Sequence, residues 1–261
     1  MSTIVFAGPS IYGLPPAQVA GFELRPPAAC GDLLLAGRDG ARVIGLIDGV
    51  FGDTASVWHK EILSLLADGI AVYGAASMGA LRAAECHPFG MIGVGAIFED
   101  YRSGARVADG DVAVLHAPAA LGFAPLTLAL VDAEAIVADL RARGDVAGAE
   151  AERLLASARR LGFRDRTWPA VLENAGLASA TTAAAVERAA ATMPGRKAAD
   201  AAALLERLRA AVPDAVPWRG GRLSRTLFLA ALDARVAAGR DGAGSQGAAS
   251  RPVTSPSSPA A

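Results

Sequence analysis

Short apolar runs alternate with amphipathic stretches through the first half of the chain. An apolar run bounded by turn residues indicates a buried strand, and apolar positions at helical spacing indicate a helix. The predicted strands are residues 3–7, 22–24, 41–47, 71–73 and 111–116. The predicted helices are residues 31–35, 56–67, 78–86 and 96–102. Because strands and helices alternate with few hairpin signals, we predict an α/β fold with a mainly parallel sheet and flanking helices on both faces.

The second half of the chain has a different pattern. Its periodicity predicts about five or six helices separated by glycine and proline, and Leu204, Leu205 and Leu208 form one apolar stripe among them. From residue 240 the chain is mostly Gly, Ser, Ala and Pro, which does not support a packed structure. We therefore expect an α/β domain over residues 1–122, an all-helical annex over 123–239 without a catalytic group, and a disordered tail over 240–261.

Composition narrows the class of protein. Apolar residues make up 52% of the chain, charged residues 20%, and the formal net charge is −1. A near-neutral chain without a basic cluster argues against nucleic acid as a partner. The two cysteines, Cys30 and Cys86, exclude a disulfide framework and a Cys-rich metal site, and they fit a reducing cytoplasm. No signal peptide or membrane span is evident, so we expect a cytoplasmic protein without membrane contact.

A phosphate-binding loop is not indicated. Gly8 and Gly13 have the spacing of the two outer glycines of such a loop, but Leu14 stands where the loop needs a lysine. We therefore expect no nucleotide, and no other cofactor or metal, in this protein.

Ser77 stands where a predicted strand turns into a predicted helix. The pattern Ala75-x-Ser77-x-Gly79 is a degenerate nucleophile elbow, with alanine in place of the first glycine. In that geometry the hydroxyl is presented at the end of a strand, and the first N–H groups of the helix, those of Met78 and Gly79, stabilise an oxyanion. Serine is also a favoured helix N-cap, which needs no chemistry. The pattern alone leaves both interpretations open.

A catalytic serine needs a base, and histidine is one candidate. The chain order Ser, Asp, His of many hydrolases is met by Ser77, then Asp100 or Asp111, then His116. His116 ends a predicted strand, which is a suitable position at the edge of a sheet.

Lysine is the other candidate base. Lysine occurs only at Lys60 and Lys197, so a retained lysine hints that an amine is needed there. Helical periodicity places Lys60 opposite the apolar stripe of its helix, which favours a solvated side chain. To act on Ser77, this lysine has to be desolvated or lie beside a second positive group, such as Arg82 or His59. Spacing does not choose between lysine and histidine.

Several blocks of the first half of the chain resemble the TfuA-like family. The blocks are Gly8-Pro9-Ser10, Asp48-Gly49-Val50-Phe51, Val57-Trp58-His59-Lys60-Glu61-Ile62, the residues from Gly74 to Glu85, and those from Gly90 to Gly95. The resemblance implies a partner of a YcaO-type ATP-dependent enzyme that thioamidates a peptide backbone. TfuA-like proteins hydrolyse the thiocarboxylate end of a ThiS-like sulfur carrier with a ubiquitin fold. They deliver the sulfide to the YcaO enzyme and help it to bind its precursor peptide.

The same resemblance implies a catalytic Ser–Lys pair. By motif match the nucleophile is Ser77 and the base is Lys60. From the chemistry of the turn, we expect the N–H groups of Met78 and Gly79 to hold the oxyanion. The residues expected to support the site or to bind the glycine tail of the carrier are Ser10, Asp48, His59, Arg82 and Glu85.

Alternatives stay open for the role of Asp48 and for the function of the whole protein. Asp48 follows a predicted buried strand, where a carboxylate is either a ligand-binding group or a local turn residue. For the whole protein, one alternative is a non-catalytic adaptor that docks carrier or peptide onto the YcaO enzyme. A further alternative is an esterase that uses His116 as its base.

Overall fold

The computed structural model describes residues 2–52, 54–178, 180–210 and 218–243. The chain divides into two compact units, residues 1–224 and 225–261, and helix α11 (Leu227–Ala243) belongs to the second. The tail expected from residue 240 overlaps the end of α11, and residues 244–261 lie outside the described residues.

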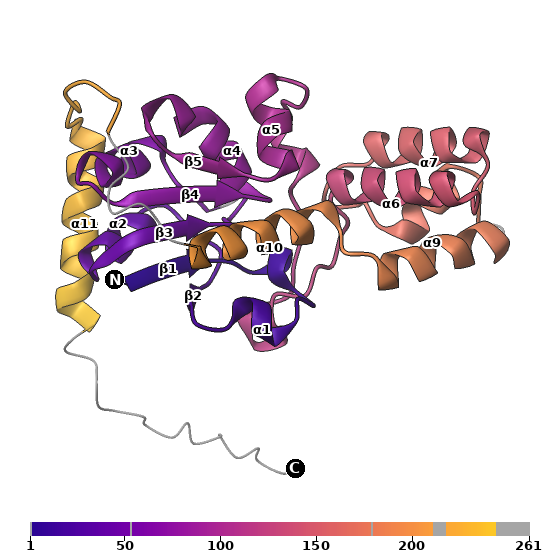
Figure 1. Ribbon diagram of the computed structural model, residues 1–261, viewed down its shortest axis with the longest axis horizontal. Helices are drawn as coiled ribbons and strands as arrows, with labels where there is room; N and C mark the ends of the chain where they lie inside the picture. Colours follow the sequence, from indigo (N-terminus) through magenta and orange to yellow (C-terminus); the bar gives the residue numbers. More distant parts are fainter. Residues whose placement is uncertain (1, 53, 179, 211–217, 244–261) are drawn as a thin grey trace, which may run out of the picture. The chain divides into compact units, whose positions relative to one another are not determined.

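Within the described residues of the first unit, five strands form one all-parallel sheet (Figure 1). They are β1 (Ser2–Phe6), β2 (Glu23–Arg25), β3 (Ala41–Leu46), β4 (Ala71–Ala75) and β5 (Ile92–Val94). The order in the sheet is β2-β1-β3-β4-β5, so the strand order reverses between β1 and β3. Doubly wound sheets bind ligands at the carboxyl ends of the strands beside this reversal. The predicted α/β fold with a mainly parallel sheet and flanking helices is confirmed.

One strand lies elsewhere in the sequence than predicted. Residues 111–116 do not join the sheet, because the segment turns back on itself and His116 forms an isolated antiparallel bridge with Pro125. The edge strand is β5 instead, and it contains Gly93. A Cβ on Gly93 would lie 2.1 Å from the ring of Phe98, so close packing and not an apolar run defines this strand.

Helices α2 (Asp32–Arg38), α3 (His59–Ala67) and α4 (Met78–Cys86) pack against the strands and against one another. The prediction of a helix over residues 78–86 is confirmed at both ends. Helix α5 (Ala96–Ser103) packs beside α4. The short elements of the connections are α1 (Pro16–Val19), η1 (Pro9–Ile11), η2 (His87–Phe89), η3 (Asp109–Asp111) and η4 (Ala119–Leu121).

Helix α10 (Arg196–Arg209) covers the opposite face of the sheet (Figure 1). Right-handed connections from β3 to β4 and from β4 to β5 place their helices on one face, whereas the connection from β1 to β2 holds the short α1. The second face is therefore left for α10, whose Leu204 and Leu205 lie in one buried cluster with Val43 and Tyr73. The apolar stripe that the sequence placed in the annex belongs to the core of the sheet.

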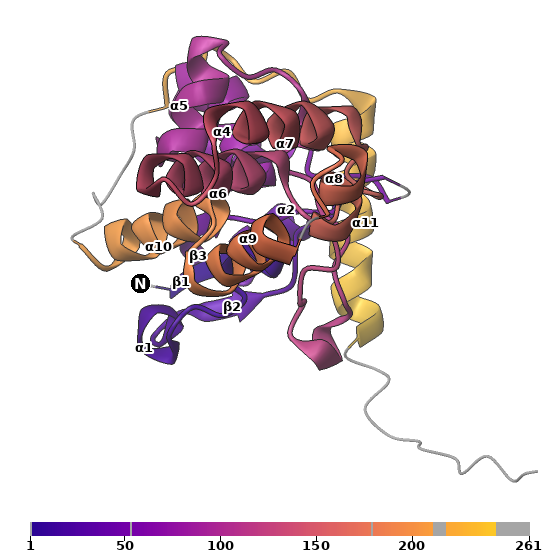
Figure 2. The ribbon, with the colours of Figure 1, turned by 90° about the vertical axis from the view of Figure 1, so that its right-hand side faces the viewer.

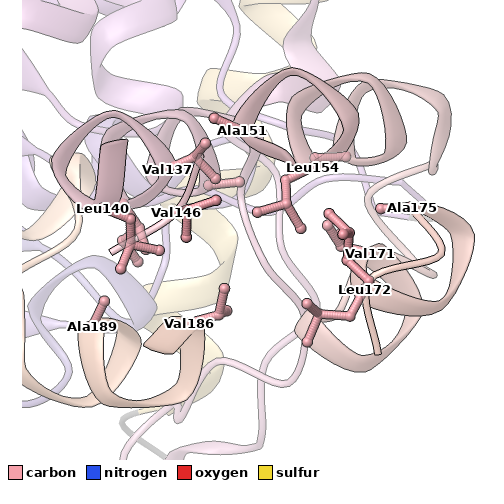
Figure 3. Close-up of a cluster of buried hydrophobic side chains, with 14 of the residues drawn as sticks. Val137, Leu140, Val146, Ala151, Leu154, Val171, Leu172, Ala175, Val186 and Ala189 are labelled. Carbon is pink, nitrogen blue, oxygen red and sulfur yellow. The ribbon is translucent and has the colours of Figure 1, made fainter. Parts of the chain in front are cut away.

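In the described residues between α5 and α10, four helices form a bundle of their own, as expected for the helical annex (Figure 2). They are α6 (Leu130–Arg143), α7 (Gly148–Arg160), α8 (Trp168–Asn174) and α9 (Ala180–Thr192). Their core is aliphatic, as Figure 3 shows for Val137, Leu140, Leu154, Val171 and Val186. Among the described residues, no helix combines the length and the apolar character that crossing a bilayer requires.

Candidate functional site

Ser77 lies in a strained turn between β4 and α4. Its side chain is buried, and 2% of the residue is exposed. The Ser77 N–H donates to the Ala75 carbonyl oxygen at 2.8 Å, and Ala76 between them has a φ of 65°. This is a γ-turn with alanine in the left-handed region, which costs on the order of 1–3 kcal/mol. The predicted strand–turn–helix setting of Ser77 is therefore present, with the backbone strain that is common at functional turns.

Two glycines let α4 approach the sheet closely. A Cβ on Gly79 would lie 1.8 Å from the Leu46 carbonyl oxygen, and a Cβ on Gly74 would lie 2.1 Å from the Gly79 carbonyl oxygen. The Gly79 N–H donates to the Ile47 carbonyl oxygen at 3.1 Å. Because this N–H is already engaged, Gly79 is not a free donor for an oxyanion, contrary to the expectation from sequence.

Two other backbone N–H groups lie near the serine without a protein acceptor in the described part of the chain. One belongs to Met78, the first residue of α4. The other belongs to Gly49. The Asp48 carbonyl and the Val50 N–H both pair with Ala28, so the Gly49 N–H points to the opposite side of its extended segment. A Cβ on Gly49 would lie 2.7 Å from Met78 Cγ, so these two residues are neighbours.

A cavity of about 290 Å³ is lined by Ser77 and by the loop that follows β3. It lies beside the reversal of the strand order, the position where doubly wound sheets bind ligands. Two of its charged residues come from much later in the sequence. The polar side chains that line the cavity are Asp48, Thr54, Ser77, His116, Arg164 and Lys197.

Lys197, the second residue of α10, brings an amine to this cavity. Its side chain is buried, and 4% of the residue is exposed. Lys197 Nζ donates to the Val112 carbonyl oxygen at 2.8 Å, and Ser77 Oγ donates to the same oxygen at 3.5 Å. The amine and the hydroxyl thus flank one acceptor. No described carboxylate lies within ion-pair distance of Lys197 Nζ.

Asp132 fixes the start of α10. Its Oδ1 accepts the Lys197 backbone N–H at 2.9 Å. Burial raises the pKa of Asp132, and the charge of Lys197 opposes that rise. Both residues also line a second cavity of about 720 Å³, which shares Pro9, Val114 and Lys197 with the first. Lys197 therefore lies between the two cavities.

Lys60 is not brought to this arrangement. It is the second residue of α3, it is half-buried, and it does not line the cavity of Ser77. Within the described part of the chain, its Nζ has no hydrogen-bond or ion-pair partner. The implied pairing of Lys60 with Ser77 stays a prediction, whereas Lys197 provides an amine beside the serine.

Three of the expected supporting residues bind one another at the start of α3. His59 Nε2 lies 2.7 Å from Glu85 Oε2, and Arg82 Nη1 donates to the same oxygen at 2.7 Å. Arg82 Nε also donates to the Val57 carbonyl at 2.7 Å. Burial opposes ionisation of Glu85, but the hydrogen bonds from His59 and Arg82 outweigh it and lower the pKa of Glu85. This cluster ties α3 to α4 and does not line the cavity of Ser77.

Asp48 and Ser10 form a buried pair at the ends of β1 and β3. Asp48 Oδ1 accepts a hydrogen bond from Ser10 Oγ at 2.6 Å. Asp48 Oδ2 accepts the N–H groups of Gly8 at 2.9 Å and Ser10 at 3.0 Å. The carboxylate thus satisfies N–H groups of the loop after β1, 38 and 40 positions earlier in the sequence, and not those of its own turn, so the interpretation of Asp48 as a local turn residue is not confirmed. A direct role in binding a ligand stays a prediction.

His116 lines the cavity but forms no triad in the described residues. Its Nδ1 lies 2.8 Å from the Ala117 carbonyl oxygen. The two candidate carboxylates, Asp100 and Asp111, pair with arginines instead. The order Ser, Asp, His is present in the sequence but is not assembled around Ser77.

Lys197 and Arg164 line the cavity but were not predicted as site residues. Both fall in the region that was assigned to the helical annex. The scarcity of lysine was a signal for Lys197, whereas Arg164 is one of many arginines and has no distinguishing pattern.

Fold and site together define a doubly wound α/β protein with a serine in a strained strand-to-helix turn and a buried amine beside it. The sequence profile of the family described as TfuA-like protein matches residues 48–167, which include Ser77 and Arg164 but not Lys197. This match, over 120 of the 261 residues, supports assignment of the chain to the TfuA-like family. Comparison with curated proteins finds no match. The match supports, in general terms, a role beside a YcaO enzyme.

Proposed function

We propose that this protein hydrolyses the thiocarboxylate of a ThiS-like sulfur carrier and delivers sulfide to a YcaO enzyme for backbone thioamidation of a peptide. Ser77 is the nucleophile, and Lys197 takes the role of the base. The proposal rests mainly on the Val112 carbonyl oxygen, to which Lys197 Nζ and Ser77 Oγ both donate.

In the first half of the reaction, Ser77 Oγ attacks the thiocarboxylate carbon and its proton passes to Lys197 Nζ. The C–S bond then breaks, the sulfur leaves with the bonding electrons, and it takes the proton from Lys197 to become hydrosulfide. Hydrosulfide is a far weaker base than the amide nitrogen that a peptidase expels, so this step needs little assistance. The product that remains on the protein is an acyl ester of Ser77.

In the second half, water attacks the acyl carbon and gives a proton to Lys197. The bond to Ser77 Oγ breaks, and Oγ recovers its proton from the amine. The sum is one thiocarboxylate and one water converted to one carboxylate, one hydrosulfide and one proton. In both halves the oxyanion is stabilised by the N–H groups of Met78 and Gly49, for which no described residue is an acceptor.

Sulfide release from a thiocarboxylated carrier, measured without a YcaO enzyme, tests this proposal. We expect Ser77→Ala to lower the rate by at least about a hundredfold, because the acyl intermediate can no longer form. Ser103→Ala, which changes an exposed serine at the end of α5, is the matched control and should keep the wild-type rate. Equally slow release by wild type and Ser77→Ala would instead favour the adaptor that docks carrier or peptide onto the YcaO enzyme.

A further inference from the structure

Arg164 places a positive charge beside the cavity of Ser77. It lies between α7 and α8, it is exposed, and it lines the same cavity as Ser77 and Lys197. Its guanidinium carbon lies 5.2 Å from the centre of the Phe163 ring. A Cβ on Gly52 would lie 3.0 Å from Arg164 Nη2, so the side chain reaches the loop that follows β3.

Apart from the Phe163 ring, the guanidinium of Arg164 has no partner within the described residues. None of them accepts a hydrogen bond from it or forms an ion pair with it. Its neighbours differ in this respect. Arg166 donates to the carbonyls of Ala158 and Leu161 at 2.8 Å, and Arg160 donates to the Asn174 carbonyl at 3.4 Å. Those arginines hold the bundle together, whereas no residue in the described part of the chain accepts a hydrogen bond from Arg164, which leaves its donors for a ligand.

The charges around the cavity favour an anion. The carboxylate of Asp48 also lines the cavity, but both of its oxygens are engaged by Ser10 and Gly8. Arg164 is the cation of this lining for which no described carboxylate is a partner. A guanidinium recognises a carboxylate-like group through two parallel N–H donors.

We infer that Arg164 binds the anionic end of the carrier and makes the site selective for a thiocarboxylate over neutral acyl groups. This inference rests on the proposed function. A thiocarboxylate carries a negative charge on the group that Ser77 attacks, and the attack adds a second. A guanidinium beside the reacting group offsets the repulsion between these two negative charges. Amides and thioesters are neutral at the same place and do not need this cation.

Binding of the unmodified carrier gives a test that does not depend on turnover. The carrier is prepared with a free carboxylate end and with an amidated end, and both are titrated by calorimetry. We expect Arg164→Gln to weaken binding of the carboxylate form about tenfold to a hundredfold, the usual effect of losing a charged hydrogen bond. Binding of the amidated form should change less than about threefold, and Arg164→Lys should recover part of the loss because it keeps the charge.

Arg160→Gln, which removes a nearby charge that does not line the cavity, is the matched control and should bind both forms as wild type does. If Arg164→Gln weakens binding of the carboxylate and amidated forms equally, Arg164 only supports the loop and the inference is overturned. The inference is also overturned if neither form binds more weakly. Sulfide release separates this failure from that of the proposed function. If the wild type releases sulfide but Arg164→Gln does not weaken binding of the carboxylate form more than that of the amidated form, the inference alone is overturned. If the wild type releases no sulfide, both the inference and the proposed function are overturned.

Discussion

At the residue scale, Glu61 is a buried carboxyl group that holds two loops beside the sheet. Its Oε1 accepts the Trp58 N–H at 2.7 Å, and its Oε2 accepts the Gly31 N–H at 3.0 Å. Burial raises the pKa of Glu61 to about 7, and the nearby charge of Asp32 acts in the same direction. The ordinary value is 4.5, so the folded protein holds this proton more tightly than the unfolded chain does.

Glu61→Gln removes this titration and should change how stability depends on pH. The contribution of Glu61 is complete below its unfolded pKa and is lost as the pH rises through about 7. Between about pH 5.5 and 8.5, the wild type should therefore lose about 2 kcal/mol more unfolding free energy than Glu61→Gln. Urea titrations of both proteins at both pH values measure the difference. A wild type that gains stability over Glu61→Gln across this range would contradict the assignment.

At the element scale, the junction of β4 and α4 depends on bare backbone at Gly79. A Cβ there would lie 1.8 Å from the Leu46 carbonyl oxygen, and neither backbone can move aside without displacing its element. We expect Gly79→Ala to lower the unfolding free energy by about 3 kcal/mol or more, because overpacking at a backbone contact is costly. Urea unfolding followed by circular dichroism measures the loss.

Gly148→Ala is the matched control for that substitution. Gly148 is the first residue of α7, and a Cβ there would meet nothing within 4 Å. Its replacement should change the unfolding free energy by less than about 1 kcal/mol. Similar losses in the two variants would show that α4 does not press on the sheet as described.

The local sequence pattern predicted most strands and helices of the sheet. It failed where tertiary packing determines which residues form a strand. The helix over residues 78–86 follows from strong helix formers and from a small-residue turn before it, both of which are local. The edge strand β5 was missed because Gly93 gives no strand signal. Its place follows from the Phe98 ring that packs over it, which is a tertiary contact. The apolar residues 111–116 were taken for a strand, but their backbone turns toward Pro125.

At the scale of the whole molecule, α10 joins a late part of the chain to the sheet. Leu204 is fully buried against Val43 and Tyr73. We expect Leu204→Ala to lower the unfolding free energy by about 2–5 kcal/mol, as core truncations of leucine do. Leu126→Ala, at a leucine that is 61% exposed, should stay within about 0.5 kcal/mol of wild type. Equal, small effects in urea unfolding would mean that α10 is not part of the core.

The same long-range contact explains why half of the candidate site escaped the sequence analysis. Ser77 lies in a local pattern, so its turn could be predicted. Lys197 reaches the site because α10 packs on a face that the short β1–β2 connection leaves open, and it lies 85 positions after its partner Val112. No spacing rule links residues so far apart. The motifs that resemble the family end before α10, so the resemblance could point to Lys60 but not to Lys197.

The pairing of Ser77 with Lys197 is tested most directly by comparing the two lysines of the chain in the sulfide-release assay. We predict that Lys197→Ala and the similarly sized Lys197→Met, both folded by circular dichroism, lose at least about a hundredfold in rate, as expected for loss of a base. Lys60→Ala should stay within about threefold of wild type. Wild-type rates in both Lys197 variants, together with a large loss in Lys60→Ala, would contradict the account and return the base to Lys60.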